Sequence, residues 1–408
     1  MSRPLKAASP GAQSPLPYGR QLIDESDIDA VVNALRSERL AHGPLVGEFE
    51  RALAGAVGAP DAAACSSGTA ALHLALAALD VGEGDLCVVP AVTFLATATA
   101  ARFCGAEVVF ADVDPDSGLM TGDCLAAAIE RAPQGIKAVL PVHLGGRICD
   151  MEAISEVARA AGALIIEDAC HAIGGADSAG RQVGSCVLSD AAAFSFHPVK
   201  TIAAGEGGAV STPRPDRAER MRRLANQGVT KELDLLQDRA LSLAADGSLN
   251  PWSYEQIELG FNYRMNEMEA ALGLSQLAKL DRFVRRRREL AGLYDAALAP
   301  LAPAVTPAPR RPGDRPALHL YQVLIDFERL GRSRARVMHE LAASGIGTQV
   351  HYIPLYRQPY FHQRYGDQAL AGADSFYLRV LALPLFPAMT TNDVGRVVEA
   401  LTGVLGLG

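Results

Sequence analysis

Five short apolar runs alternate with helical stretches between residues 18 and 211, and this alternation restricts the possible folds strongly. The runs occupy residues 87–90, 107–112, 137–142, 163–168 and 191–196, and the helical stretches include residues 69–79, 124–131 and 151–161. Asp150 stands at the N-cap position of the last of these helices. Strands that are apolar on both faces and separated by helices are typical of a parallel or mostly parallel sheet. The sequence therefore predicts an α/β fold.

The alternation ends after residue 211, where a second, smaller unit is predicted. An irregular segment over residues 236–253 precedes one long helix over 266–297, and six of the 24 prolines fall in a linker over residues 300–316. A strand over 319–327, a helix over 333–344 and a strand over 345–352 then indicate an α+β domain. A chain of 408 residues is long enough for two domains. We expect a flexible tail over residues 1–17, a large domain over 18–258 and a small C-terminal domain over 259–408.

Charge and cysteine content argue against several classes of protein. The 38 basic and 46 acidic side chains give a net charge of −8, which disfavours nucleic-acid binding. The seven cysteines include no CxxC pair, so neither a disulfide framework nor a metal site is expected, and a reducing, cytoplasmic environment is favoured. The one basic run, residues 285–288, is predicted to be a solvated helix face.

No membrane segment is expected. The longest uncharged apolar stretch, residues 86–101, is shorter than the roughly 20 residues that a bilayer requires. It contains Pro90 and three threonines, so it is predicted to form a buried strand, a turn and a buried helix. Residues 1–17 lack the apolar core of a secretion signal.

Three segments at predicted strand or helix ends contain reactive or anion-binding groups. Residues 66–72 (SSGTAAL) open a helix with free N–H groups and hydroxyls, which suits a phosphate but equally suits an ordinary helix cap. Asp168 ends a buried strand, with His171 three residues later, where α/β sheets bind ligands; it could also cap the next helix. Lys200 follows the strand FSF in a polar turn that precedes the glycines of GEGG. A lysine in such a crevice can act as a nucleophile, although most lysines lie on the surface.

The three segments together predict a site for pyridoxal phosphate (PLP). This cofactor requires a lysine for its Schiff base, a carboxylate for its pyridinium nitrogen and a cradle for its phosphate. A nicotinamide cofactor is disfavoured because no GxGxxG follows the first strand.

The segments SSGTAAL, EDACHA, FSFHPVKTIAAGEGGA and GFNYRMNEMEAALGLSQL resemble those of the DegT/DnrJ/EryC1/StrS sugar aminotransferases, a branch of the fold type I PLP-dependent enzymes. The resemblance extends from Tyr18 to the C-terminus. It implies a large domain with a mostly parallel sheet flanked by helices, a smaller C-terminal α+β domain, and a homodimer with shared active sites.

The resemblance also implies the cofactor contacts. Lys200 would form the Schiff base, Asp168 would pair with the pyridine nitrogen, and His171 would lie beside the phenolic oxygen. Phe94 would stack on the ring, and Asn262 would reach the phosphate of the neighbouring subunit. The residues expected to hold the phosphate within one subunit are Gly68, Thr69, Ala70 and Ser195.

The predicted substrates are L-glutamate and a 4-keto-6-deoxy nucleotide sugar. Within the family, the chain is most similar to the branch that aminates C4 of such a sugar in pseudaminic acid biosynthesis. The residues expected to contact the sugar nucleotide are Tyr18, Leu40, Ala41, His197, His351, Tyr352, Ile353 and Pro354. His351 could instead be a structural histidine at a strand end. The chain departs from the family at residues 226–228, where Asn-Gln-Gly replaces a common His-Gly pair.

The sequence is also compatible with other functions. One is an aminotransferase for another 4-keto or 3-keto nucleotide sugar, of the perosamine or antibiotic-sugar type. A PLP-dependent sugar dehydratase is less favoured, because that branch of the family replaces the lysine. A cofactor-binding regulator without turnover would need an effector domain, for which the two predicted domains leave no room.

Overall fold

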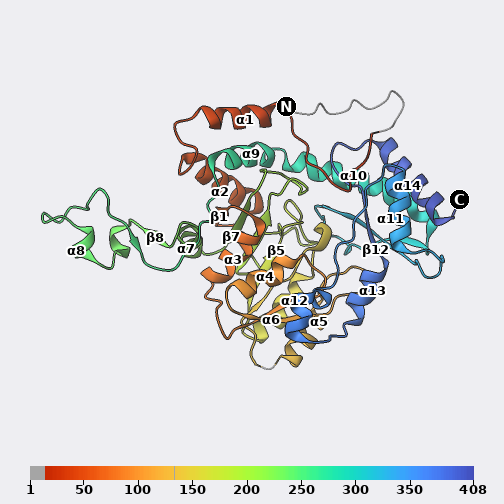
Figure 1. The fold of residues 1–408 in the computed structure, drawn as a ribbon, viewed down its shortest axis with the longest axis horizontal. Coiled ribbons are helices and arrows are strands. Elements are labelled where there is room, and N and C mark those ends of the chain that lie inside the picture. The colour runs from red at the N-terminus through yellow and green to blue at the C-terminus, as the bar shows by residue number, and fades with distance from the viewer. Residues whose placement is uncertain (1–13, 133) are drawn as a thin grey trace.

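The computed structural model describes residues 14–132 and 134–408, and its largest element is a seven-stranded sheet (Figure 1). The strand order is β1-β7-β6-β5-β4-β2-β3. The pairs from β3 through β6 are parallel, whereas β7 is antiparallel to both β6 and β1. The strands are β1 Asp61–Cys65, β2 Leu86–Pro90, β3 Glu107–Ala111, β4 Ala138–Val139, β5 Leu164–Asp168, β6 Ala191–Ser195 and β7 Gly208–Thr212. The predicted α/β fold with a mostly parallel sheet is confirmed.

Helices cover both faces of this sheet. One apolar core contains residues of α3 to α7. A second core, on α2, also contains residues of α9 Glu267–Leu277 and of the start of α10 Leu280–Leu298. Asp150 caps α6 as predicted, because its side chain accepts the N–H of Ala153 at 3.2 Å. The helices of the large unit are α1 Glu25–Arg36, α2 Pro44–Val57, α3 Gly68–Ala78, α4 Leu95–Phe103, α5 Gly122–Arg131, α6 Met151–Ala160 and α7 Pro215–Ala225.

A second, antiparallel sheet with the order β10-β11-β12 forms the smaller unit. Its strands are β10 Val305–Pro307, β11 Tyr321–Ile325 and β12 Val380–Leu383, so the predicted linker contains an edge strand. The core of this unit also includes α10 Leu280–Leu298, α11 Arg334–Ala343 and α14 Thr391–Leu405. The predicted strand over 345–352 is wrong. This segment makes only isolated bridges, because residues 349–353 leave the sheet to line a cavity.

The single long helix predicted over 266–297 is also wrong. It is divided into α9 Glu267–Leu277 and α10, and Lys279 at the break forms an ion pair with Asp27 of α1 at 2.8 Å. The first turns of α10 pack in the core of the large unit and its later turns in the core of the small unit. We therefore propose a domain boundary within α10 rather than at residue 258.

The basic run on α10 is not uniformly solvated, so that prediction is wrong for Arg287. Its side chain is only 1% exposed, and it donates to the carbonyls of His319 (3.1 Å) and Leu385 (2.7 Å). The guanidinium thereby joins α10 to the segments that flank the small sheet.

The predicted tail is only partly described. Residues 1–13 lie outside the described residues. Leu16 is buried, its N–H donates to Gly345 at 2.8 Å, and its carbonyl accepts the N–H of Gly347 at 2.7 Å. The expectation of a loose segment is therefore wrong here, because two backbone hydrogen bonds fix Leu16 to the small unit.

An arm extends from the body between α7 and α9, at the left of Figure 1. The short strands β8 Val229–Thr230 and β9 Glu255–Gln256 form its base, and α8 Arg239–Ser242 lies beyond them in the segment predicted to be irregular. Two further helices, α12 Pro359–Tyr365 and α13 Ala371–Arg379, lie between α11 and β12 in the chain. Within the described residues, every helix is too short or too polar to span a bilayer.

Candidate active site

A cavity of about 570 Å³ lies at the carboxyl ends of the parallel strands. This is the edge at which open α/β sheets bind ligands, and the volume is typical of a small-molecule site. Its walls come from the ends of β5 and β6, the start of α3 and the segment 349–353. The predicted site residues that line it are Tyr18, Gly68, Thr69, Phe94, Asp168, His171, Ser195, His197, Lys200, His351, Tyr352 and Ile353.

The structure does not bring the other predicted residues into this cavity. The N–H of Ala70 is already used, because it donates to the Ser67 hydroxyl at 3.1 Å. The backbone of Asn262 forms an isolated antiparallel β-bridge with that of Asn226, near the arm. Pro354 is buried and follows the lining residue Ile353 in the chain. Leu40 and Ala41 precede α2, and the Leu40 carbonyl accepts the N–H of Glu267. Their roles stay predictions.

The start of α3 forms an anion cradle. Helix N-termini present N–H groups without intrahelical partners, together with the positive end of the helix dipole. Ser67 is the N-cap, and Gly68 and Thr69 follow it at the cavity wall. A Cβ added to Gly68 would lie 2.7 Å from the Cβ of Ser195, so only glycine lets α3 approach the end of β6 this closely.

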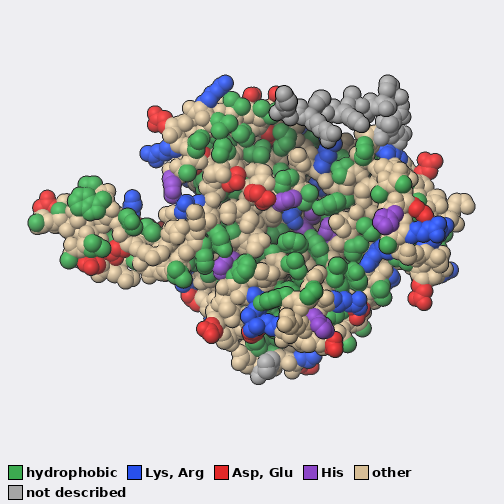
Figure 2. Space-filling view, viewed as in Figure 1, with side chains coloured by type: hydrophobic (Ala, Val, Ile, Leu, Met, Phe, Trp, Pro, Cys, Tyr) green, Lys and Arg blue, Asp and Glu red, His purple; other side chains and the backbone are tan. Residues whose placement is uncertain are grey.

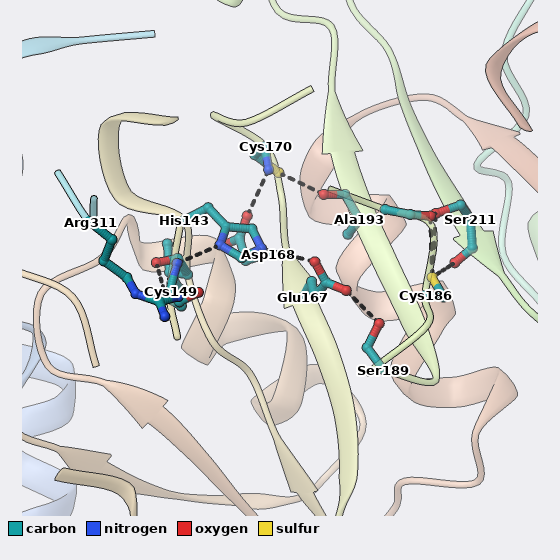
Figure 3. A network of polar contacts seen from close by, with 12 residues as sticks. His143, Cys149, Glu167, Asp168, Cys170, Cys186, Ser189, Ala193, Ser211 and Arg311 are labelled. Carbon is teal, nitrogen blue, oxygen red and sulfur yellow. Dashed lines mark hydrogen bonds and ion pairs between the residues drawn. The ribbon is translucent and has the colours of Figure 1, made fainter. Parts of the chain in front are cut away.

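Asp168 is held rigidly at the end of β5. Its Oδ2 accepts a hydrogen bond from the hydroxyl of Thr97 at 2.7 Å, and its Oδ1 accepts the N–H of Cys170 at 3.2 Å. The preceding residue, Glu167, is anchored by His143 at 2.9 Å and by Ser189 at 2.5 Å (Figure 3). The strand end is thus fixed on either side of the carboxylate that lines the cavity.

Lys200 lies in the turn after β6, and its backbone N–H donates to the carbonyl of His197 at 2.8 Å. Burial lowers the pKa of its amine, and the nearby Cys170 and Asp168 only partly oppose this effect. A lowered pKa increases the fraction of free amine at neutral pH, which is the nucleophilic form.

Histidines and a tyrosine form the wall opposite α3. His171 Nδ1 accepts the N–H of Gly145 at 3.2 Å, so the ring proton resides on Nε2, which faces the hydroxyl of Tyr352 at 3.4 Å. Burial is the main cause that lowers the pKa of His171 well below its usual value, and it lowers the pKa of His351 to about 3. The Nδ1 atom of His351 is buried and has no hydrogen-bond partner among the described residues. These rings are therefore neutral hydrogen-bonding groups.

Sequence reasoning missed several residues of the lining. Cys170 and Glu206 reach the cavity, as do Gln349 and Gln358. Thr93 also lines it, and its hydroxyl lies 2.8 Å from that of Thr97. The spacing of Thr93 and Thr97, four residues apart after a buried strand, could have indicated this pair, whereas the positions of the two glutamines depend on the fold of the small unit.

Another hollow, of about 700 Å³, follows the edge strand β3, but it lacks comparable chemistry. Its charged groups are paired with one another: Glu107 lies 2.8 Å from Arg102 and also contacts Arg364. Elsewhere in the described ranges, 14–132 and 134–408, no group of three or more His, Cys, Asp or Glu side chains could hold a metal ion.

A mostly parallel sheet flanked by helices is the fold of the fold type I PLP-dependent transferases, and the cavity at its edge brings together a lysine, a carboxylate and the start of α3. The chain belongs to the DegT/DnrJ/EryC1/StrS aminotransferase family, which matches residues 21–402. It is therefore a sugar aminotransferase of that family.

Similar proteins extend over nearly the whole chain. The spore coat polysaccharide biosynthesis protein SpsC of Bacillus subtilis is 38% identical over 393 residues, which cover 96% of this chain and 97% of SpsC. Helicobacter pylori PseC, an aminotransferase involved in the biosynthesis of pseudoaminic acid, has a TM-score of 0.87 at 26% identity and covers 97% of this chain and 100% of its own. The putative sugar aminotransferase Spr1654 of Streptococcus pneumoniae, in its PLP form, has a TM-score of 0.85 at 26% identity, with 96% and 99% covered.

Proposed function

We propose that this chain uses pyridoxal phosphate to move an amino group from L-glutamate to C4 of a 4-keto-6-deoxy nucleotide sugar. The observation that supports this most directly is that Lys200, Asp168 and the N-terminus of α3 line one cavity. Each of these groups matches one part of the cofactor: its aldehyde, its ring nitrogen and its phosphate.

The residues present fit this cofactor. The close approach of α3 to β6 at Gly68 leaves a cradle of backbone N–H groups beside the Ser195 hydroxyl. Phe94 is 52% exposed at the cavity wall, where an aromatic face is available for stacking on a planar ring. The PLP form of Spr1654 further supports the assignment.

When bound, PLP supplies an electron sink that stabilises a carbanion beside the amino nitrogen. In our proposal, Lys200 holds the cofactor covalently between turnovers and, once displaced by the incoming amine, moves a proton between the two carbons that exchange the amine. Asp168 keeps a proton on the ring nitrogen, and the closely packed wall of His171 and Tyr352 limits the access of water.

The identity of the sugar is proposed from the similar proteins. The likeness to PseC supports UDP-4-amino-4,6-dideoxy-N-acetyl-β-L-altrosamine transaminase as the most specific assignment. The likeness to SpsC, which is named for a spore coat polysaccharide, equally supports another 4-keto or 3-keto nucleotide sugar. The lysine within the cavity disfavours a sugar dehydratase.

We further propose that the enzyme is a homodimer with shared sites. Lys200 is the single Lys or Arg among the described residues that line the cavity, although the substrates carry carboxylates and phosphates. Further cationic and polar groups, including Asn262, would come from a second subunit. The arm supports this arrangement, because it exposes the apolar side chains Leu241 (65%) and Trp252 (73%), and Figure 2 shows its apolar tip.

A panel of substrates tests the proposal. The purified, PLP-loaded protein would be incubated with L-glutamate and 4-keto-6-deoxy or 3-keto nucleotide sugars that differ in base and ring configuration, and the products would be identified by NMR. We expect an amine at C4 of a UDP-linked sugar, together with 2-oxoglutarate, and no product from Lys200→Ala. Amination at C3 would contradict the assigned carbon, and the absence of any amine would contradict the transaminase.

A further inference from the structure

Two threonines lie next to Asp168 at the start of α4, and one of them, Thr93, also lines the cavity. Thr97 is fully buried and Thr93 is 1% exposed. The Thr97 hydroxyl donates to Asp168 Oδ2 at 2.7 Å, and the hydroxyls of Thr93 and Thr97 are 2.8 Å apart. The two residues stand one helical turn apart, Thr93 just before α4 and Thr97 in its first turn, so both hydroxyls point toward the end of β5.

The direction of this chain of hydrogen bonds follows from proton counting. An ionised carboxylate only accepts hydrogen bonds, so Thr97 must donate its one hydroxyl hydrogen to Asp168. Thr93 must then donate to the oxygen of Thr97. Each bond polarises the next, and a hydrogen bond to a charged group is stronger than one between neutral groups.

These contacts also fix the orientation of the carboxylate. Oδ2 is held by Thr97 at 2.7 Å and Oδ1 by the N–H of Cys170 at 3.2 Å. With one hydrogen bond on each oxygen, the carboxylate plane cannot rotate freely, and unused lone pairs remain on the face that lines the cavity. Neither threonine needs to touch a ligand for this effect.

We propose that Thr97, supported by Thr93, is a positioning residue that holds the Asp168 carboxylate oriented for the ring nitrogen of the cofactor. The inference rests on the proposed use of pyridoxal phosphate. The start of α4 would thereby contribute to cofactor recognition. The hydrogen bonds from Thr93 to Thr97 and from Thr97 to Asp168 affect a ligand only through the contact between Asp168 and a ring nitrogen. A ligand without that nitrogen gains nothing from them.

This dependence provides the test. The dissociation constants of pyridoxal phosphate and of its 1-deaza analogue, in which carbon replaces the ring nitrogen, would be measured by absorbance titration for the wild type and for Thr97→Val. We expect Thr97→Val to weaken the binding of pyridoxal phosphate roughly tenfold while leaving the binding of the analogue within about twofold, because only one charge-assisted hydrogen bond network is lost.

Two further variants separate positioning from packing. Thr97→Ser keeps the hydroxyl and should restore the affinity for pyridoxal phosphate. Thr212→Val is the matched control, because Thr212 is equally buried and donates to the Asp190 carbonyl at 2.9 Å in β7, yet does not line the cavity; it should change neither constant. If Thr97→Val does not fold, Thr93→Val should give the same selective loss with a smaller factor.

The outcomes distinguish a failure of the role of Thr97 from a failure of the proposed function. Equal loss of both ligands in the valine variants, or no loss of either, would overturn the role of Thr97 while leaving the proposed function intact. Failure of the wild type to bind pyridoxal phosphate would overturn the proposed function and, with it, this inference.

Discussion

Burial shifts the pKa values of several titratable groups around the cavity in the direction that favours their neutral forms. It lowers the pKa of Lys200 and holds the pKa values of His171 and His351 far below the usual value for histidine. These two histidines of the cavity lining therefore act as neutral hydrogen-bonding groups. Asp168, which accepts two hydrogen bonds from the protein, is the carboxylate best placed to interact with a cationic ring.

The first prediction concerns the charge of Asp168. Asp168→Asn should fold, because an amide is nearly isosteric, but its transamination rate should fall by about 10²-fold or more, equivalent to roughly 3 kcal/mol of lost transition-state stabilisation. An amide has no negative charge with which to keep the ring nitrogen protonated. Steady-state kinetics, with circular dichroism as the folding control, would decide; a near-normal kcat would refute the role.

At the scale of single elements, α3 joins the sheet to the ligand site. Its N-terminus meets the end of β6 at Gly68, and residues along its length are buried in the core of the large unit. The anion cradle therefore depends on how the whole helix packs against β6.

Gly68→Ala should disturb this contact. The new Cβ would lie 2.7 Å from that of Ser195, so α3 or β6 must shift, at a cost of about 1–3 kcal/mol of stability. The affinity for pyridoxal phosphate should fall more than the affinity for pyridoxal, because the shift opens the phosphate cradle. Gly82→Ala is the control, since a Cβ there meets no atom within 4 Å. Equal losses for the two ligands would show that the cradle does not hold the phosphate.

The elements that sequence reasoning located best are those with a strong local pattern. The five apolar runs are strands β2 to β6, and the site residues at their ends follow from that placement. The strand β1, Asp-Ala-Ala-Ala-Cys, was missed because alanine has a low preference for strands, yet small side chains suit a strand packed between α2 and α7. The break at Lys279 was missed because it depends on Asp27, 252 residues away along the chain.

The positions of residues 349–353 in the cavity wall depend on how the small unit packs against the large one, and no local pattern reveals that packing. For the same reason the sequence could suggest Asn262 as a cofactor contact only by resemblance. Within one chain it bridges Asn226 instead.

For the molecule as a whole, the buried histidines whose pKa is lowered predict sensitivity to acid. Burial lowers the pKa of His73 from 6.5 to about 4, so below pH 6.5 the unfolded chain binds a proton that the folded chain does not. Stability should therefore fall between pH 6.5 and 4, by up to about 1.4 kcal/mol per pH unit for each such histidine. Urea unfolding at pH 7, 6 and 5 should show a shallower decline for His73→Gln, whereas the exposed control His339→Gln should follow the wild type. An unchanged slope in His73→Gln would contradict the buried, neutral ring.

The shared site of the proposed dimer can be tested by complementation. Lys200→Ala and Asn262→Ala subunits, each inactive alone, would be mixed under conditions of demonstrated exchange. Each heterodimer would have one site with both changes and one with neither, so activity should return to about half of wild type per heterodimer. If both variants are inactive and exchange occurs, yet no activity returns, Asn262 serves its own subunit.

The central claim is that one cavity, which Lys200 lines, exchanges an amine between two substrates in turn. The most direct measurement adds L-glutamate alone to the PLP-loaded enzyme and determines the 2-oxoglutarate released per subunit. We predict about one equivalent, no further release until a 4-keto nucleotide sugar is supplied, and none from Lys200→Ala, because the first half-reaction needs no sugar. Release only when the sugar is already present, or undiminished release from Lys200→Ala, would contradict the account.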